Sequence, residues 1–249
     1  MQKVVVDSEK HMVGFILIIC CVLSAVGVTG YCQDNSYVVK AGTHPSKVIP
    51  KGEQFQYPDF RDGYLYFTTG KKSDSMLLNY NLLYDAIMII DKTGDTVALS
   101  RESNIVEFVQ IQSDFFFQDA EKRYFLLLTT EDPLKLMIRS RWNIVSRETV
   151  SYTDSPGSPV EAHAQGTTVG GFVFPNEDVT FQKWVDYYFL GPQNKVYDVA
   201  RSSLNKVFPD YKKSIKGYLF QNKINFTNES DLKMLTSFCN GLTSRRQPE

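Results

Sequence analysis

The spacing of apolar and polar positions changes once along the chain. From about residue 37 to 150, short apolar and aromatic runs alternate with polar turns at intervals of about 8 to 12 residues, which is typical of an antiparallel sandwich or barrel. After Gly191 and Pro192, apolar residues recur at the helical period. We therefore expect an α+β fold, with an antiparallel β-rich core (sandwich or partly open barrel) followed by a C-terminal segment of about three short helices.

The apolar runs place the individual strands. The expected strands cover 64–69, 76–80, 86–91, 96–99, 105–111, 115–118, 124–129 and 134–139, with a further pair at 172–174 and 184–190. The run 86–91 has no polar side, so we expect it centrally in the sheet with both faces covered. In 134–139 apolar and basic positions alternate, which predicts a strand with one face toward water.

The helical pattern begins after Pro192. Six apolar residues are expected to share one face of the first helix: Val196, Val199, Ala200, Leu204, Val207 and Phe208. Pro209 is expected to end this helix or to start the next one. Asn228 can cap a third helix, in which Leu232, Leu235 and Phe238 face inward.

The N-terminus has the pattern of a signal peptide. Lys3 and Lys10 precede an apolar run over 12–28, which is at the short limit for a helix that spans a bilayer, and small residues follow it. We expect cleavage after Gly30 or after Cys32; the alternative is an uncleaved anchor. The mature protein is then exported to the periplasm, the periphery of the outer membrane or the outside of the cell, without a transmembrane anchor.

Composition divides the whole chain into segments. The stretch 151–171 is rich in Pro, Gly, Ser and Thr and holds little that could be buried, so it is expected to be a flexible loop. The expected organisation is a signal peptide over 1–32, a β domain over 33–150, a loop over 151–171, additional strands of the β domain over 172–192, a helical segment over 193–242 and a polar tail over 243–249.

Charge and motifs narrow the chemistry. The formal net charge of −1 argues against a protein built to hold nucleic acid. Nucleophile elbows, phosphate loops and dinucleotide fingerprints are absent from the sequence. The mature chain has only His44 and His163, so no metal site and no cofactor are expected. Cys239 is expected to be a buried, inert thiol; a nucleophile with His44 as its base is the weaker alternative.

Two groups of residues are candidates for contact with a ligand or surface. Asn79, Tyr80 and Asn81 place two amides around an aromatic ring and could bind a ligand, together with Tyr64 and Tyr66 as a sugar-stacking patch. The alternatives are core rings and amides that hold a turn through backbone hydrogen bonds. The second group consists of Lys212, Lys213 and Lys216. These lysines could contact an anionic surface, or simply form a solvated helix face.

Two stretches of sequence carry a resemblance to known proteins. They are the N-Y-N of 79–81 with the following G-D-T turn of 94–96, and the F-P-D of 208–210 with the K-I-N-F of 223–226. In these stretches the chain resembles uncharacterised exported proteins of Bacteroidota. The resemblance implies a place in the periplasm or at the outer membrane, and it implies no activity, cofactor or catalytic residue.

These features lead to three hypotheses about function. The first is an exported envelope protein that binds a ligand or an envelope protein, or has an accessory role, and is not an enzyme. The second is a carrier of an apolar ligand, with the sheet curved around a cavity. The third is a secreted hydrolase that acts through a pair of carboxylates, although no pair is marked in the sequence.

Overall fold

The computed structural model describes residues 36–100, 105–149 and 173–244. The chain divides into two units, Met1–Asn35 and Ser36–Glu249, and the description concerns the second. The expected signal peptide and flexible loop, together with residues 245–249 of the polar tail, lie outside the described residues. Within the described ranges, no helix combines the length and the apolar character needed to cross a bilayer.

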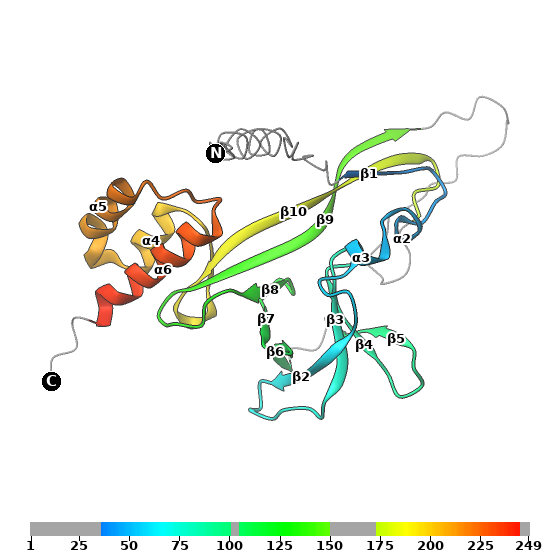
Figure 1. The fold of residues 1–249 in the computed structure, drawn as a ribbon, viewed down its shortest axis with the longest axis horizontal. Helices are drawn as coiled ribbons and strands as arrows, with labels where there is room; N and C mark the ends of the chain where they lie inside the picture. Colours follow the sequence, from blue (N-terminus) through cyan, green and yellow to red (C-terminus); the bar gives the residue numbers. More distant parts are fainter. Residues whose placement is uncertain (1–35, 101–104, 150–172, 245–249) are drawn as a thin grey trace, which may run out of the picture. The chain divides into compact units, whose positions relative to one another are not determined.

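The strands form one antiparallel sheet, which confirms the expected α+β class (Figure 1). Ten strands follow each other by hydrogen bonding, and β11 (Val196–Asp198) pairs with β10 outside this path. The order is β1 (Ser36–Val39), β10 (Glu177–Leu190), β9 (Lys135–Thr149), β8 (Tyr124–Leu127), β7 (Asp114–Gln118), β6 (Val106–Ile111), β2 (Arg61–Phe67), β3 (Met76–Asn81), β4 (Ala86–Ile90) and β5 (Thr96–Ala98).

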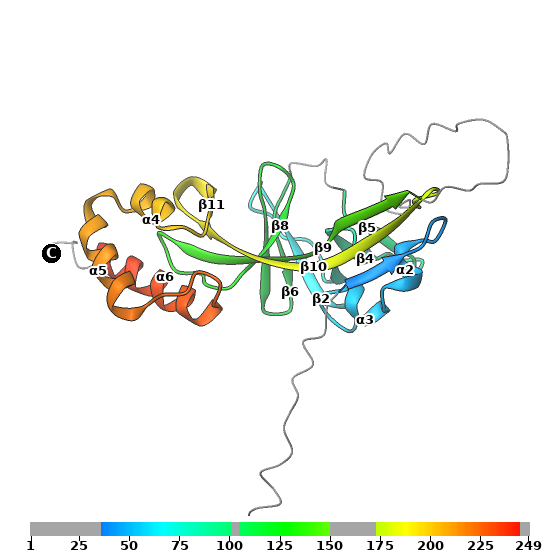
Figure 2. The same ribbon diagram turned by 90° about the horizontal axis from the view of Figure 1, so that it is seen from above.

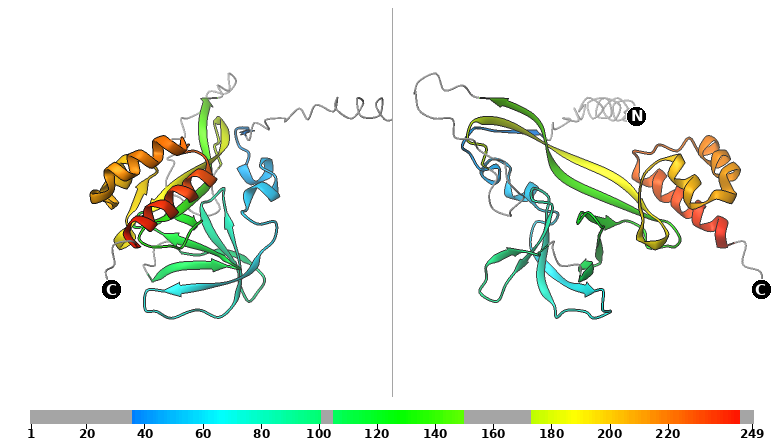
Figure 3. Two further views of the ribbon diagram at one scale, coloured as in Figure 1. Left: turned by 60° about the vertical axis from the view of Figure 1, so that its left-hand side comes forward. Right: turned by 180° about the vertical axis from the view of Figure 1, so that it is seen from behind.

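The two longest strands differ from the expectation. The strand expected at 134–139 belongs to β9 from Lys135 onward, and the strand expected at 184–190 is part of β10. These strands have 15 and 14 residues and pair with each other along their whole length. Figures 2 and 3 show β9 and β10 running beside each other. Residues 173–174 form no strand. Polar residues interrupt the apolar pattern in the outer parts of both strands, and cross-strand pairing keeps these parts extended.

The C-terminal segment also starts differently from the expected pattern. Val196 was expected on a helix, but it lies in β11, because Leu190 and Val196 pair across the tight connection between β10 and β11. The helices are α4 (Arg201–Val207), α5 (Lys212–Asn222) and α6 (Glu229–Ser244), with short 3-10 helices at Pro192–Asn194 and Pro209–Tyr211. Two further short helices, α2 (Pro45–Val48) and α3 (Lys51–Gln54), were not expected.

The cap of the last helix agrees with the expectation. The Asn228 side-chain oxygen accepts the backbone N–H of Asp231 at 3.0 Å, which satisfies one of the free donors at the start of α6. Leu232 and Leu235 on this helix are fully buried. Figure 1 shows α4, α5 and α6 gathered near one end of the β9–β10 hairpin.

Buried side chains form two main clusters. The sheet core includes Val39, Leu65, Leu78, Tyr80, Ile87, Val109, Phe116, Tyr124, Trp142 and Phe181. The helix core consists of Leu134, Leu136, Phe189, Leu204, Phe208, Ile215, Leu232, Leu235 and Cys239. Strand β9 contributes Trp142 to the sheet core and Leu136 to the helix core. The hairpin therefore belongs to both clusters.

The prediction that one face of the strand at 134–139 is exposed to water is wrong at Met137. Met137 is fully buried in a third, smaller cluster with Phe117, Phe125 and Leu190. Leu134 and Leu136 point to the helix core on the other face. The beginning of β9 is therefore covered on both sides, because the helices pack on one face and strands β7 and β8 supply aromatic side chains to the other.

The sheet curls so that strands distant in its order approach each other. The pairing of β8 with β9 covers only Ile138 and Met137 of β9. Further along β9, the backbone N–H of Trp142 donates to the carbonyl of Leu82, just after β3, at 3.1 Å. The Trp142 indole N–H donates to the Glu53 carbonyl at 2.9 Å. The segment after β3 thus takes the place beside β9 that β8 leaves open.

Candidate functional site

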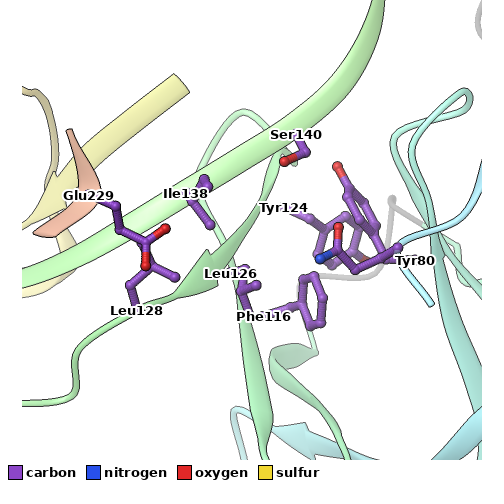
Figure 4. A pocket seen from close by; sticks show the side chains of 9 residues that line it. Tyr80, Phe116, Tyr124, Leu126, Leu128, Ile138, Ser140 and Glu229 are labelled. Atoms are coloured by element: carbon purple, nitrogen blue, oxygen red, sulfur yellow. The ribbon is translucent and has the colours of Figure 1, made fainter. Parts of the chain in front are cut away.

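A cavity of about 180 Å³ lies on the face of the sheet that carries the sheet core. Side chains from β3, β7, β8 and β9 line it, and the first residue of α6 lies at its edge. Figure 4 shows the aromatic rings of Tyr80, Phe116 and Tyr124 grouped at one end, with Leu128 and Glu229 at the other. The remaining lining residues are Gln56, Leu126, Ile138 and Ser140.

The apolar wall of the cavity follows from strand register. Phe116 of β7 is opposite Leu126 of β8, and Leu126 is opposite Ile138 of β9. Directly opposite residues in an antiparallel sheet project to the same face with their Cβ atoms about 5 Å apart. The three side chains therefore form a continuous apolar row across three strands.

Polar groups interrupt this wall at defined places. Ser140 is two residues after Ile138 on β9, so its hydroxyl lies on the same face of the strand. Gln56 brings an amide from the segment before β2, and Glu229 brings a carboxylate from α6. A ligand in the cavity would meet mainly carbon surface, with hydrogen-bonding partners at a few points.

An ion pair fixes the tyrosine at the aromatic end. The Tyr80 hydroxyl donates to one carboxylate oxygen of Asp85 in the β3–β4 turn. The other oxygen accepts a hydrogen bond from the Arg139 guanidinium of β9 at 2.6 Å. Only 11% of the Arg139 side chain and 18% of the Asp85 side chain are exposed. The ring of Tyr80 is therefore held by a largely buried charge pair that also joins the β3–β4 turn to β9.

Glu229 supplies the charge at the opposite end. Its carboxylate accepts from the Lys233 ammonium at 2.7 Å, one helical turn further along α6. Its position in the first turn of α6 is favourable, since the helix dipole stabilises negative charge there. Burial, and then the negative charge of Glu229, raise the pKa of the neighbouring Tyr187 hydroxyl.

The structure separates the three residues predicted from the N-Y-N motif. Asn79 accepts the Tyr57 backbone N–H at 3.2 Å and donates to the Tyr57 carbonyl at 2.9 Å. Asn81 accepts the N–H groups of Leu83 and Tyr84 at 2.9 and 3.0 Å. Both amides are buried and hold the backbone, whereas Tyr80 lines the cavity. Ligand binding by this motif stays a prediction, and Tyr80 is the residue in place for it.

Tyr64 and Tyr66 lie on the other face of β2 from buried Leu65. The Lys72 ammonium lies 3.4 Å from the ring centre of Tyr64 and 5.4 Å from that of Tyr66. Such a cation–π contact occupies one face of the ring. The structure gives no contact between these rings and the amides of Asn79 and Asn81.

Cys239 is fully buried in the helix core, as the sequence indicated. Burial raises the pKa of its thiol to about 12, so the reactive thiolate is disfavoured. His44 lies at the start of α2, where its Nδ1 accepts the Ser46 N–H at 3.2 Å. The helix core contains no histidine among the described residues.

The lining residues Phe116, Leu126, Ile138, Ser140 and Glu229 were not singled out from the sequence. The alternation of apolar positions in β7, β8 and β9 was visible, but it does not show where the sheet curls. Lys212, Lys213 and Lys216 are all exposed on α5, away from the cavity lining.

Acidic, histidine and cysteine side chains were also compared across the part of the chain that the structure describes. That part contains no group of three or more His, Cys, Asp or Glu residues able to hold a metal ion. Glu229 is the one carboxylate among the residues that line the cavity.

Comparisons with protein-family models, curated proteins and solved structures found no match to this chain.

Proposed function

We propose that this chain is an exported envelope protein that acts by binding, not by catalysis, and that its cavity holds a small, mainly apolar molecule. The cavity of about 180 Å³ with its apolar row is the observation that carries this proposal. It joins two of the hypotheses drawn from the sequence, the binding protein and the carrier.

The volume limits the size of the ligand. An engineered apolar cavity of about 150 Å³ binds benzene, whereas pockets for drug-sized molecules measure about 300 to 1,000 Å³. A cavity of about 180 Å³ therefore fits one ring with a short substituent.

The polar groups limit its chemistry. The Ser140 hydroxyl, the Gln56 amide and the Glu229 carboxylate can accept hydrogen bonds, and the carboxylate accepts only. The Glu229 carboxylate is 40% exposed and bonded to Lys233, and it can accept a further hydrogen bond, so a ligand with a hydroxyl or amine group fits this end better than a pure hydrocarbon. The proposed ligand class is a ring-sized molecule with one donor group.

The curled sheet supports this assignment. The hydrogen bond from Trp142 to the carbonyl of Leu82 is what a partly open barrel would contain, and the mouths of β-barrels are frequent ligand sites. The signal-peptide pattern over 1–32 and the resemblance to exported Bacteroidota proteins support the envelope location.

The hydrolase hypothesis receives less support from the same site. Glycoside hydrolysis commonly uses two carboxyl groups about 5 to 9.5 Å apart across the substrate. The lining of the cavity has one, and that one is bonded to Lys233.

Binding can be tested with phenol, which matches the cavity in size and carries one hydroxyl. We expect saturable binding to the purified mature protein in saturation-transfer NMR, and loss of binding in Leu126→Trp, which fills the cavity. Leu77→Trp is the matched control, because Leu77 is exposed on β3. Equal binding by both variants, or none by the unmodified protein for phenol, indole and cyclohexanol, would refute the proposal.

Export needs a separate test. The full chain should be expressed with its own N-terminus in a Bacteroidota host, and the mass of the protein recovered from the envelope measured. A mass that begins at Tyr31 or Gln33 supports export with cleavage. An intact chain recovered from the cytoplasm contradicts it.

A further inference from the structure

One face of α5 combines lysines with an exposed aromatic ring. Lys216 and Gly217 lie three and four residues after Lys213, and Phe220 lies four and three residues after them, so all four lie along the same side of the helix. The Phe220 side chain is 85% exposed, the largest value among the exposed apolar residues of the described chain. Ile215, on the opposite side, is fully buried in the helix core.

The charge of this face has one sign. Helix α5 contains Lys212, Lys213 and Lys216, and Lys223 follows it directly. It contains no Asp or Glu. None of the four lysines takes part in an ion pair that the structure shows within the described ranges. Four positive charges are therefore available to a partner within about three helical turns.

The position of Phe220 selects the kind of partner. Lysines alone would fit any polyanion, but a ring with 85% exposure gains nothing from a hydrated acidic chain. At the surface of a bilayer, an aromatic ring enters the boundary of headgroups and acyl chains while lysines remain with the phosphates. Apart from its chain neighbours and the nearby backbone of α5 itself, no atom lies within 4 Å of the Cβ position of Gly217, so the helix backbone can approach such a surface closely.

We propose that the α5 face, defined as Lys212, Lys213, Lys216, Phe220 and Lys223, binds an anionic lipid surface. Phe220 enters the interface, and the lysines contact the phosphate groups. This goes beyond the proposed function and does not depend on the cavity, whose lining shares no residue with the α5 face.

The expected effects follow from membrane electrostatics. A lysine near an anionic surface contributes about fivefold in affinity, so loss of two lysines should weaken binding about 25-fold. Loss of the inserted ring should weaken it about tenfold. Raising the salt concentration should weaken the electrostatic part, because it shortens the screening length.

The test uses the purified mature protein and two kinds of vesicle, one of phosphatidylcholine alone and one with 30% phosphatidylglycerol as a chosen composition. We expect cosedimentation with the anionic vesicles only. Lys213→Gln with Lys216→Gln should reduce it about 25-fold, and Phe220→Ser about tenfold. The matched controls, Lys71→Gln with Lys92→Gln and Met234→Ser, change exposed residues elsewhere and should leave binding unchanged.

Several outcomes would overturn the proposal. They are absence of binding to anionic vesicles, equal binding to both vesicle types, and equal effects of the α5 variants and their controls. A DNA oligonucleotide or a polyglutamate-like acidic peptide could also compete with the vesicles for this face. If it does, and if Phe220→Ser leaves its binding unchanged, the face would be assigned to a soluble polyanion instead. All substituted side chains are exposed, so a thermal melt should show that the variants remain folded.

Discussion

Replacing Asp85 by alanine removes the carboxylate that joins Tyr80 to Arg139. The Arg139 guanidinium would then lie largely buried without its counter-charge, and its Nε already has no hydrogen-bond partner in the described structure. The Tyr80 hydroxyl would lose its acceptor beside the cavity. The change therefore tests whether this ion pair stabilises the contact between the β3–β4 turn and β9.

The magnitude follows from burial. Removing one partner of a fully buried ion pair costs about 3 to 5 kcal/mol. Exposure of 18% and 11% at Asp85 and Arg139 lets water screen part of that, so we expect about 2 kcal/mol. Asp85 also has a positive φ of 52°, where alanine costs about 1 kcal/mol more. The free energy of unfolding should fall by about 3 kcal/mol in Asp85→Ala.

A double-mutant cycle separates the ion pair from the backbone effect. Asp85→Ala, Arg139→Met and the double variant should be unfolded in urea at pH 7 and followed by far-UV circular dichroism. We expect a coupling energy of about 1.5 kcal/mol, because each single change leaves a charge without its partner. Asp85→Asn should cost less than Asp85→Ala, since asparagine tolerates positive φ and keeps an acceptor oxygen.

The more exposed pair of Arg141 and Asp186 provides the matched control. These side chains are 2.8 Å apart at closest approach and 18% and 38% exposed. Exposed pairs contribute about 0.5 kcal/mol, and the same cycle here should give that value. A coupling for Asp85 and Arg139 no larger than this control would refute the reasoning.

Three further predictions concern other parts of the structure. Cys239 should not react with a thiol reagent at pH 8 until urea unfolds the protein. Because folding raises the pKa of its thiol, the free energy of unfolding should be constant below the unfolded pKa of about 8.5 and should fall as the pH rises above that value, as urea unfolding at several pH values would show. A hydrogen bond from Lys40, and then one from the Ala41 N–H, lower the pKa of Asp178. The contribution of Asp178 to stability is therefore present above the unfolded pKa of about 3.9 and is lost as the pH falls through the lower folded value. Carboxyl NMR titration should show a smaller shift in Lys40→Met, because the Ala41 hydrogen bond remains. Asn228→Ala removes the acceptor for the N–H of Asp231 and should lower the free energy of unfolding by about 1 kcal/mol in urea, whereas an unchanged midpoint would contradict the assigned cap.

Local patterns were enough to place most of the strands. The turn at Gly94, with its φ of 89°, and the cap at Asn228 depend on neighbouring residues only, so they could be read directly. The burial of Cys239 also followed from the helical period of α6. In each case the determining interactions lie within a few residues of sequence.

Features that depend on distant parts of the chain were missed. The strand at Val196 exists because Leu190 of β10 lies beside it, which outweighs the helical spacing of its apolar residues. Met137 is buried because aromatic residues of β7 and β8 cover it, although basic neighbours suggested a wet face. The cavity requires Leu126 and Ile138 to be opposite each other on a curled sheet, and no local pattern contains that curvature.

The hairpin of β9 and β10 would couple binding of the proposed ligand to the order of α6. Leu136 packs in the helix core, and Ile138, two residues along the same strand, lines the cavity. Glu229 lines the cavity from the first turn of α6. The ligand proposed for this cavity would contact both sides of this junction, so its binding would disfavour the local opening of α6. By thermodynamic reciprocity, the factor by which the ligand would disfavour that opening equals the factor by which opening of α6 would weaken its binding.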